Sequence, residues 1–309
     1  MSTGWNIGII GGSGLSQAIE SQAIESQAIE LEDAQEIAVA SPFGAPSGPV
    51  TTGRLAGVRF TFLARHGSGH HLSPSSVNYR ANIDVLKRCG VSDVLALSAI
   101  GSLNEAMAPG HFVAVDQLID RTQGRVNSFF GASSSDASSS DRGLVAHVSL
   151  ADPTCPRLSA LAADAAQAAG ATVHRGGCYI AIEGPQFSTR AESRLYRQWG
   201  ADVIGMTAMP EARLAREAEL PYALLGMVTD YDSWREGEED VDAERVLSVM
   251  QANARTAQAA LRQLAESLTG PREPSPIDHA LDGAIMTAPA ARDAKLAIML
   301  DAVAGRVLR

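Results

Sequence analysis

The chain has 309 residues, of which 45% are hydrophobic and 19% charged, so it is long enough for one large α/β domain or two smaller ones. A formal net charge of −10 argues against a nucleic-acid partner, because neutralising nucleic-acid phosphates requires clustered Lys and Arg. The sequence has no apolar run of 18 residues and no N-terminal signal pattern, and its three cysteines lie far apart, so we expect a cytoplasmic protein with reduced thiols and no membrane partner.

The first predicted strand, Trp5 to Ile10, runs into the glycine turn Gly11-Gly12-Ser13-Gly14. Such a turn brings backbone N–H groups and the Ser13 hydroxyl close to an anion, although glycine turns also occur for purely structural reasons. It is not a dinucleotide-binding fingerprint, because that pattern would need glycine in place of Gln17. Residues 16–30 then repeat Ser-Gln-Ala-Ile-Glu, and we interpret them as a helical or mobile surface insertion without an assigned function.

The run from Val58 to Ala64 has the pattern of a strand and is followed directly by Arg65 and His66. A cationic pair just beyond a strand offers the donors that an oxyanion such as phosphate requires, and a solvated loop is the alternative. The adjacent His70 and His71 lack acidic partners at helical spacing, so we expect no metal site.

The rest of the chain alternates predicted strands and helices. A helix over 76–89 precedes a buried strand over 93–97, whose end carries Ser98 and Ala99, and a strand at 203–204 leads to Met206 and Thr207. Other strands are predicted at 112–115 and 179–182, and other helices at 156–169, 188–199, 209–218 and 241–268. This alternation predicts an α/β fold, a single-domain mixed, largely parallel sheet flanked by helices. The polar stretch 128–142 is expected to be a mobile loop, a gate or a surface insertion, and residues from about 277 to 309 a helical tail.

The stretch from Leu224 to Trp234 is the most informative about a functional site, because an apolar run ends there in two acids, Asp230 and Asp232. The pattern predicts a buried strand that ends where open α/β sheets bind ligands. Partial burial would raise the pKa of a carboxyl group at such a place, which makes Asp230 the leading candidate for a general acid. A solvated turn is the structural alternative.

Several segments together resemble the methylthioadenosine phosphorylase branch of the trimeric purine nucleoside phosphorylase family. They are the glycine turn, Ala64-Arg65-His66-Gly67, residues 74–83, Asp116 to Thr122, Ile182 to Glu192, and Thr229-Asp230-Tyr231-Asp232. The resemblance runs from about residue 5 to about residue 250.

The resemblance implies phosphorolysis of an N-glycosidic bond, with inorganic phosphate as co-substrate and no organic cofactor or metal. It implies a homotrimer or a dimer of trimers, in which a neighbouring subunit supplies His147 to the active site. Transferred position by position, the implied phosphate ligands are Ser13, Arg65, His66, Ser98 and Thr207. The implied nucleoside-binding residues are Ala99, Met206, Phe187, Tyr231 and Asp232 together with Asp230 and His147, and the 5′ group would meet Ala243, Val246 and Leu247.

Two positions distinguish relatives within the family. The 6-oxopurine phosphorylases carry glutamate at the position of Ser188 and asparagine at that of Asp230, so this chain is expected to favour a 6-aminopurine. Ala243 replaces a larger residue of some relatives, which leaves adenosine or bulkier 5′-thio groups open. The alternatives are a phosphorylase of methylthioinosine or another 6-oxopurine nucleoside, a nicotinamide-dependent oxidoreductase, and a nucleoside-binding module without catalysis.

Overall fold

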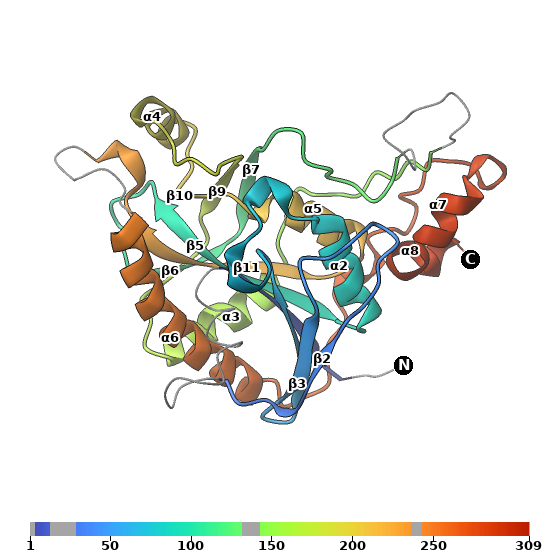
Figure 1. The fold of residues 1–309 in the computed structure, drawn as a ribbon, viewed down its shortest axis with the longest axis horizontal. Helices are drawn as coiled ribbons and strands as arrows, with labels where there is room; N and C mark the ends of the chain where they lie inside the picture. Colours follow the sequence, from blue (N-terminus) through green and yellow to red (C-terminus); the bar gives the residue numbers. More distant parts are fainter. Residues whose placement is uncertain (1–3, 13–28, 132–142, 236–242, 309) are drawn as a thin grey trace.

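The computed structural model describes residues 4–12, 29–131, 143–235 and 243–308, apart from the side chains of residues 243–247. Within these residues, eleven strands form one sheet (Figure 1). The strands are β1 (Asn6–Gly11), β2 (Glu32–Ile37), β3 (Val50–Leu55), β4 (Val58–Ala64), β5 (Asp93–Ser102), β6 (Phe112–Val115), β7 (Gln117–Arg121), β8 (Val173–Arg175), β9 (Cys178–Ile182), β10 (Val203–Gly205) and β11 (Tyr222–Asp230).

The centre of the sheet is parallel. Strand β1 pairs in parallel with β4 and β5, and β5 pairs in parallel with β11. The antiparallel pairs are β2 with β3, β3 with β4, β5 with β10, and β6 with β11. The prediction of a mixed, largely parallel sheet is therefore confirmed.

Helices cover both faces of this sheet (Figure 1). The helices are α2 (Tyr79–Arg88), α3 (Pro156–Ala168), α4 (Arg190–Gln198), α5 (Ala208–Glu217), α6 (Ala243–Ser267), α7 (Ala294–Met299) and α8 (Asp301–Leu308). Single 3₁₀ turns lie at Ser68–His70, Pro74–Ser76, Asp232–Trp234, Pro276–His279 and Pro289–Ala291. In the predicted tail, from about 277 to 309, the α-helices are α7 and α8, and Val303 of α8 is buried in the core.

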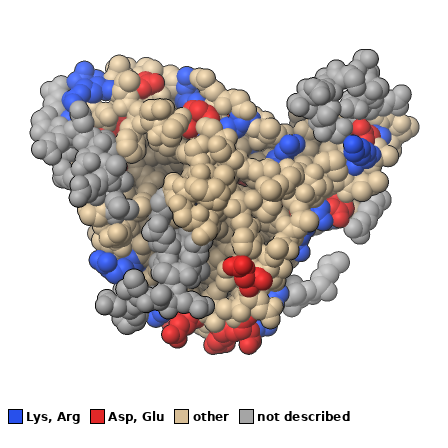
Figure 2. All heavy atoms as spheres, viewed as in Figure 1, with Lys and Arg blue, Asp and Glu red and all other residues tan. Residues whose placement is uncertain are grey.

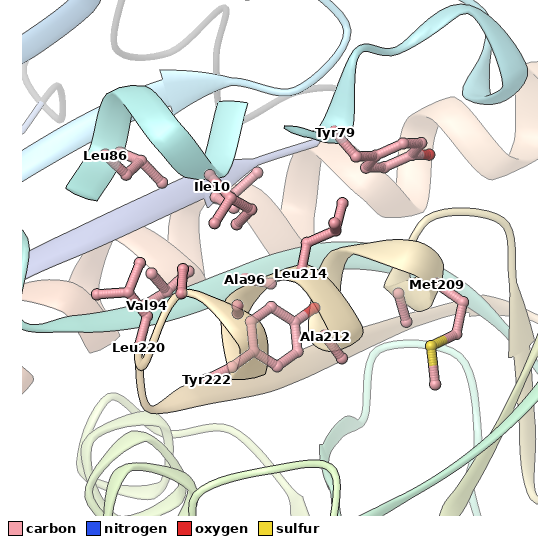
Figure 3. Packing of buried hydrophobic residues seen from close by; sticks show 14 of the residues in the cluster. Ile10, Tyr79, Leu86, Val94, Ala96, Met209, Ala212, Leu214, Leu220 and Tyr222 are labelled. Atoms are coloured by element: carbon pink, nitrogen blue, oxygen red, sulfur yellow. The ribbon is translucent and has the colours of Figure 1, made fainter. Parts of the chain in front are cut away.

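The central strands are buried on both sides, because their alternate residues enter two different cores. In β5, Val94 and Ala96 join the core beneath α2, α5 and α8, whereas Leu95 and Leu97 join the core beneath α3 and α6. Figure 3 shows the first core, where Leu86 and Tyr79 of α2 and Leu214 of α5 surround Ile10 of β1 and the β5 side chains. Because both faces are buried, the sequences of β5 and β11 are apolar at successive positions instead of alternating.

Strands β2, β3, β7 and β8 were not expected from the sequence, and β5 is longer than expected. The sequence pattern ends this strand at Leu97, but the strand continues through Ser102. The extension forms because Gly226 of β11 pairs with Ser98 and Ile204 of β10 pairs with Gly101. Ser98 and Ala99 therefore belong to the strand itself, which fixes their position more firmly than a loop would.

Two predicted segments fall largely outside the described residues. They are the repeat at 16–30, of which Ile29 and Glu30 are described, and the polar loop at 128–142, described up to Gly131. Across the described ranges, no helix is both long enough and apolar enough to cross a membrane. On the face shown in Figure 2, the described basic side chains are scattered among other residues rather than gathered into one patch.

Candidate active site

A cavity of about 330 Å³ lies at the carboxyl ends of the central strands, where α/β sheets bind ligands. Arg65 and His66 follow β4, Gly12 follows β1, and Asp230 ends β11. The predicted residues that line this one cavity are Arg65, His66, Ser98, Ala99, Phe187, Met206, Thr207, Asp230 and Asp232. The fold thus brings together side chains that are up to 167 positions apart in the sequence, from Arg65 to Asp232.

Arg65 is buried, with 1% of its surface exposed, and most of its donors are engaged within the protein. Its Nε and Nη2 donate to the two carboxylate oxygens of Glu211 at 2.8 and 3.1 Å. Nη1 donates to the Leu97 carbonyl at 3.2 Å and Nη2 to the Ile10 carbonyl at 3.4 Å. Although burial opposes the charge, the ion pair with Glu211 holds the pKa of Arg65 above its ordinary value. Of the five N–H groups, four donate to described residues, and one on Nη1 is left for a ligand within this part of the chain.

Gly12 makes room beside this guanidinium. A Cβ atom at position 12 would lie 3.3 Å from Nη1 of Arg65 and 3.4 Å from the Leu97 carbonyl oxygen. Gly12 of the predicted glycine turn therefore lies next to the cationic side chain. Ser13, its predicted hydroxyl, lies outside the described residues.

His66 has a defined tautomer, because its Nδ1 lies 2.8 Å from the Leu72 carbonyl oxygen and a carbonyl can only accept a hydrogen bond. Burial and the positive charge of Arg65 lower the pKa of His66 to about 4. The sequence analysis treated His66 as a cation, but near neutral pH it is a neutral imidazole with Nδ1 protonated. Its Nε2 therefore accepts a hydrogen bond, such as one from a protonated phosphate oxygen.

Two hydroxyl groups complete this end of the cavity. Thr207 precedes α5, and its Oγ1 is buried without a hydrogen-bond partner among the described residues. Ser98 Oγ donates to the Ala99 carbonyl at 3.1 Å, which leaves its lone pairs free to accept. A buried hydroxyl without a partner is costly, so Thr207 is well suited to bind a ligand here.

The two acids differ in their hydrogen bonding. Asp230 accepts from Thr229 Oγ1 at 2.7 Å and from the Asp232 backbone N–H at 2.9 Å. The Ser193 hydroxyl and the Ser233 backbone N–H interact with Asp232 and oppose the rise of its pKa, but its Oδ2 is buried and makes no direct hydrogen bond of normal geometry among the described residues. Burial raises the pKa of Asp230, and burial together with the charge of Asp230 raises the pKa of Asp232 to about 6. Burial, the cause named in the sequence analysis, is the largest contribution to the raised pKa of both acids.

Gly101 creates the space for this pair. The pairing of β11 with β5 shifts register between Val228 and Asp230, and Asp230 comes to lie opposite Gly101. A Cβ atom at Gly101 would lie 3.1 Å from Asp230 Oδ1 and 3.0 Å from Ile204 Cγ2. The sequence analysis missed this role, for which a glycine within a strand pattern is the available signal.

Three predicted residues do not line the cavity. Ser188 is buried next to Phe187, and its Oγ has no hydrogen-bond partner in the described part of the chain. The Tyr231 hydroxyl lies 3.4 Å from the Glu105 carbonyl, and the Tyr231 ring contacts Arg235 instead of the cavity. His147 donates its backbone N–H to the Ala284 carbonyl near the C-terminal segment.

The α6 helix reaches the cavity through Met250, which the sequence analysis did not select. The side chains of Ala243, Val246 and Leu247 lie outside the described residues. Met250 lies one helical turn beyond Val246 and Leu247, so helical spacing could have identified it.

Glu211 and Tyr222 were also missed. The Tyr222 hydroxyl donates to Glu211 Oε1 at 2.9 Å, and each of these residues is 1% exposed. They form a buried group that orients Arg65. Among the described side chains, no group of three His, Cys, Asp or Glu is placed to hold a metal ion.

The sequence profile of the phosphorylase superfamily matches residues 6–266. The chain belongs to this superfamily. This phosphorylase-superfamily chain is 54% identical to the S-methyl-5′-thioadenosine phosphorylase of Cereibacter sphaeroides, over 98% of both sequences. It is 51% identical to the S-methyl-5′-thioadenosine phosphorylase of Bradyrhizobium diazoefficiens, also over 98% of both.

Solved phosphorylase structures show the same fold. A methylthioadenosine phosphorylase from an antarctic soil metagenomic library superposes with a TM-score of 0.85 at 42% identity, covering 98% of this chain and 99% of that one. A variant of the Schistosoma mansoni adenosine/methylthioadenosine phosphorylase, in complex with methylthioadenosine, superposes with a TM-score of 0.75 at 34% identity, covering 85% and 91% of the two chains. Both the predicted fold class and the predicted family are confirmed.

Proposed function

We propose that this chain catalyses the phosphorolysis of S-methyl-5′-thioadenosine to adenine and 5-methylthio-α-D-ribose 1-phosphate. The observation that carries the proposal is the meeting of a partly buried carboxyl pair and a fully buried arginine in one cavity. Strand β5 separates them, because Arg65 bonds to Leu97 and Asp230 lies opposite Gly101. Four residues of strand correspond to about 13 Å, enough for a phosphate and a ribose to lie between the arginine and the base.

Phosphate would bind at the Arg65 end. Arg65 Nη1 and the hydroxyls of Ser13 and Thr207 would donate to its oxygens, and the Ser98 hydroxyl would do so on turning away from the Ala99 carbonyl. His66 Nε2 would accept a hydrogen bond from a protonated phosphate oxygen. Because Glu211 already balances the charge of Arg65, the phosphate keeps much of its negative charge. That charge stabilises the positive ribose as the glycosidic bond breaks.

The base would bind at the carboxyl end. A phosphate oxygen forms a bond to C1′ while the C1′–N9 bond breaks and its electron pair passes to the purine. Asp230 as general acid protonates N7, and Asp232 accepts from the exocyclic amine. Phe187, which is 48% exposed, would stack on the base, while Ser188 and Tyr231 would support this end, and Ala99 and Met206 would line the ribose.

A homotrimer, or a dimer of trimers, would complete the site. His147 does not line the cavity of its own chain, so we assign it with Ala243, Val246 and Leu247 to the 5′ group at a subunit boundary. Large apolar side chains are exposed at Val126 (56%), Leu195 (41%) and Trp199 (46%). Subunit contacts would cover these side chains in the proposed assembly.

The proposed reaction needs inorganic phosphate but no organic cofactor or metal. We also propose a cytoplasmic location and a single phosphorylase domain that includes the C-terminal tail. Cys89, Cys155 and Cys178 are free thiols, which supports the location.

The test is turnover of four nucleosides, methylthioadenosine, methylthioinosine, adenosine and inosine, each with and without phosphate. We expect adenine release from methylthioadenosine that requires phosphate. A preference for methylthioinosine would indicate a 6-oxopurine enzyme, and binding without phosphate-dependent turnover would indicate a binding module.

A further inference from the structure

Arg125 lies outside the cavity but touches several segments that form it. Its side chain is 3% exposed and lies beyond the end of β7. Among the described residues, its guanidinium donates to three backbone carbonyls, one carboxylate and one tyrosine hydroxyl.

Two of these bonds hold the phosphate end. Arg125 Nη1 donates to the Met206 carbonyl at 2.6 Å and to the Met209 carbonyl at 2.9 Å. These two carbonyls lie on either side of Thr207, which lines the cavity at the proposed phosphate site. The position of Thr207 therefore depends on Arg125.

Two more bonds hold the base end. Arg125 Nη2 donates to the Glu183 carbonyl at 2.7 Å, and Nε lies 3.2 Å from the Glu183 carboxylate. Glu183 begins the loop that carries Pro185 and Phe187 into the cavity wall. One planar guanidinium thus fixes the loop under the base and the segment under the phosphate.

The Glu183 carboxylate extends this network. It accepts hydrogen bonds from the backbone N–H of Gln123 at 2.7 Å and from the Ser75 hydroxyl. The Tyr79 hydroxyl, 3.2 Å from Arg125 Nη1, donates to the carbonyl of Pro74, a third part of the cavity wall. A lysine could not replace this arrangement, because its single ammonium lacks the planar set of five donors.

We propose that Arg125 is a positioning residue that couples phosphate binding at one end of the cavity to base binding at the other. This inference rests on the proposed function. Phosphate bound at Thr207 fixes the Met206–Met209 segment, which orients Arg125 and through it the Glu183–Phe187 loop. The coupling is reciprocal, so each ligand increases the affinity for the other by the same factor.

The experiment measures adenine binding by calorimetry, without phosphate and with saturating inorganic phosphate. Adenine and phosphate cannot react with each other, so the ratio of the two dissociation constants reports the coupling at equilibrium. For the unmodified protein we expect a ratio of about fivefold or more. For Arg125→Lys we expect a ratio close to one.

Arg216→Lys is the matched control. Arg216 is also buried and also donates to two backbone carbonyls, those of Ser149 and Asp152, but it is not among the described residues that line the cavity, and neither of those carbonyls belongs to a cavity-lining residue. We expect it to keep the coupling ratio of the unmodified protein. Glu183→Gln, which retains the side-chain shape, provides a second variant if Arg125→Lys does not fold, and its ratio should fall in between.

A purely structural role for Arg125 predicts a lower melting temperature with an unchanged coupling ratio, and this result would overturn the inference. A ratio of one in the unmodified protein would overturn it as well. Failure of the proposed function is a different result, in which the unmodified protein releases no adenine from methylthioadenosine.

Discussion

Asp230 and Asp232 both line one end of the cavity, and their protonation state determines which hydrogen bonds a bound base can form there. Asp230 already accepts two hydrogen bonds, whereas Asp232 Oδ2 makes no direct hydrogen bond of normal geometry in the described residues. Because the two carboxyls interact, they titrate as a pair. With the pKa of Asp232 raised to about 6, the pair carries a proton below that pH and loses it above.

A first prediction concerns the pH dependence of adenine binding. The bound base needs one proton on the pair, to donate to N7, and one ionised oxygen, to accept from the amine. Above pH about 6, binding must therefore take up a proton, and adenine affinity should fall about tenfold per pH unit. Calorimetry in buffers of different ionisation enthalpy measures this uptake. The Asp230→Asn variant donates through an amide instead and should show no such dependence; an unchanged dependence would contradict the assignment.

A second prediction concerns turnover. Asparagine cannot transfer a proton, so Asp230→Asn should lower turnover of methylthioadenosine by about 10²–10⁴-fold. Part of the loss should be recovered on methylthioinosine, because an amide both donates to and accepts from a base edge that carries a carbonyl. Equal loss on both substrates, or a stability change alone, would indicate that Asp230 is a structural turn residue.

At the scale of elements, three of them meet at Arg65. Strand β4 delivers the arginine, helix α5 carries Glu211, and β11 begins with Tyr222. The three side chains are linked by hydrogen bonds and are almost completely buried. Removing one partner of such an ion pair leaves the other charge buried and uncompensated.

A third prediction follows for stability. Glu211→Ala should lower the free energy of unfolding by about 3–5 kcal/mol, as measured by urea denaturation. Asp164→Asn is the control, because Asp164 pairs with Arg175 while 67% of its side chain is exposed. Breaking this surface pair should cost about 0–1 kcal/mol. Equal losses of unfolding free energy in the two variants would show that the buried ion pair contributes no more to stability than the surface pair.

The elements differ in how well their sequences predict them. Strands β1, β4, β5 and β11 are rich in buried apolar residues, so their composition marks them. Strand β2 is exposed at all six positions and polar in sequence, and only its pairing with β3 holds it, so no local signal predicts it.

The site was predictable to a similar degree. Motifs located Arg65, which directly follows a strand, Asp230, which ends one, and Thr207, which lies two residues beyond one. Glu211 could not be inferred, because it meets Arg65 across 146 residues of sequence. The neutral state of His66 could not be inferred from the sequence either, since its lowered pKa depends on burial and its tautomer on the Leu72 carbonyl.

At the scale of the whole molecule, the proposed trimer makes each site depend on two chains. Asp230 belongs to the cavity of its own chain, whereas His147 would serve a neighbour. Each active site would combine Asp230 of one subunit with His147 of its neighbour. Substitutions at these two residues are therefore expected to impair a site through different subunits.

A fourth prediction uses this difference. Asp230→Asn and His147→Ala should each reduce activity, and mixing the two proteins under conditions of subunit exchange should restore part of it. The control mixes Asp230→Asn with Thr207→Val, which both line one chain's own cavity and should show no recovery. Absence of recovery in the first mixture, or an active monomer by light scattering, would contradict the shared site.

The internal bonding of Arg65 has a consequence for the protein in a cell. Because Glu211 and two backbone carbonyls already compensate its guanidinium, folding does not depend on an anion at this position. Phosphate adds stability only by mass action, in proportion to how much of it is bound. A cell that runs short of phosphate would thus lose the reaction while keeping the folded enzyme, which would resume work as soon as phosphate returned.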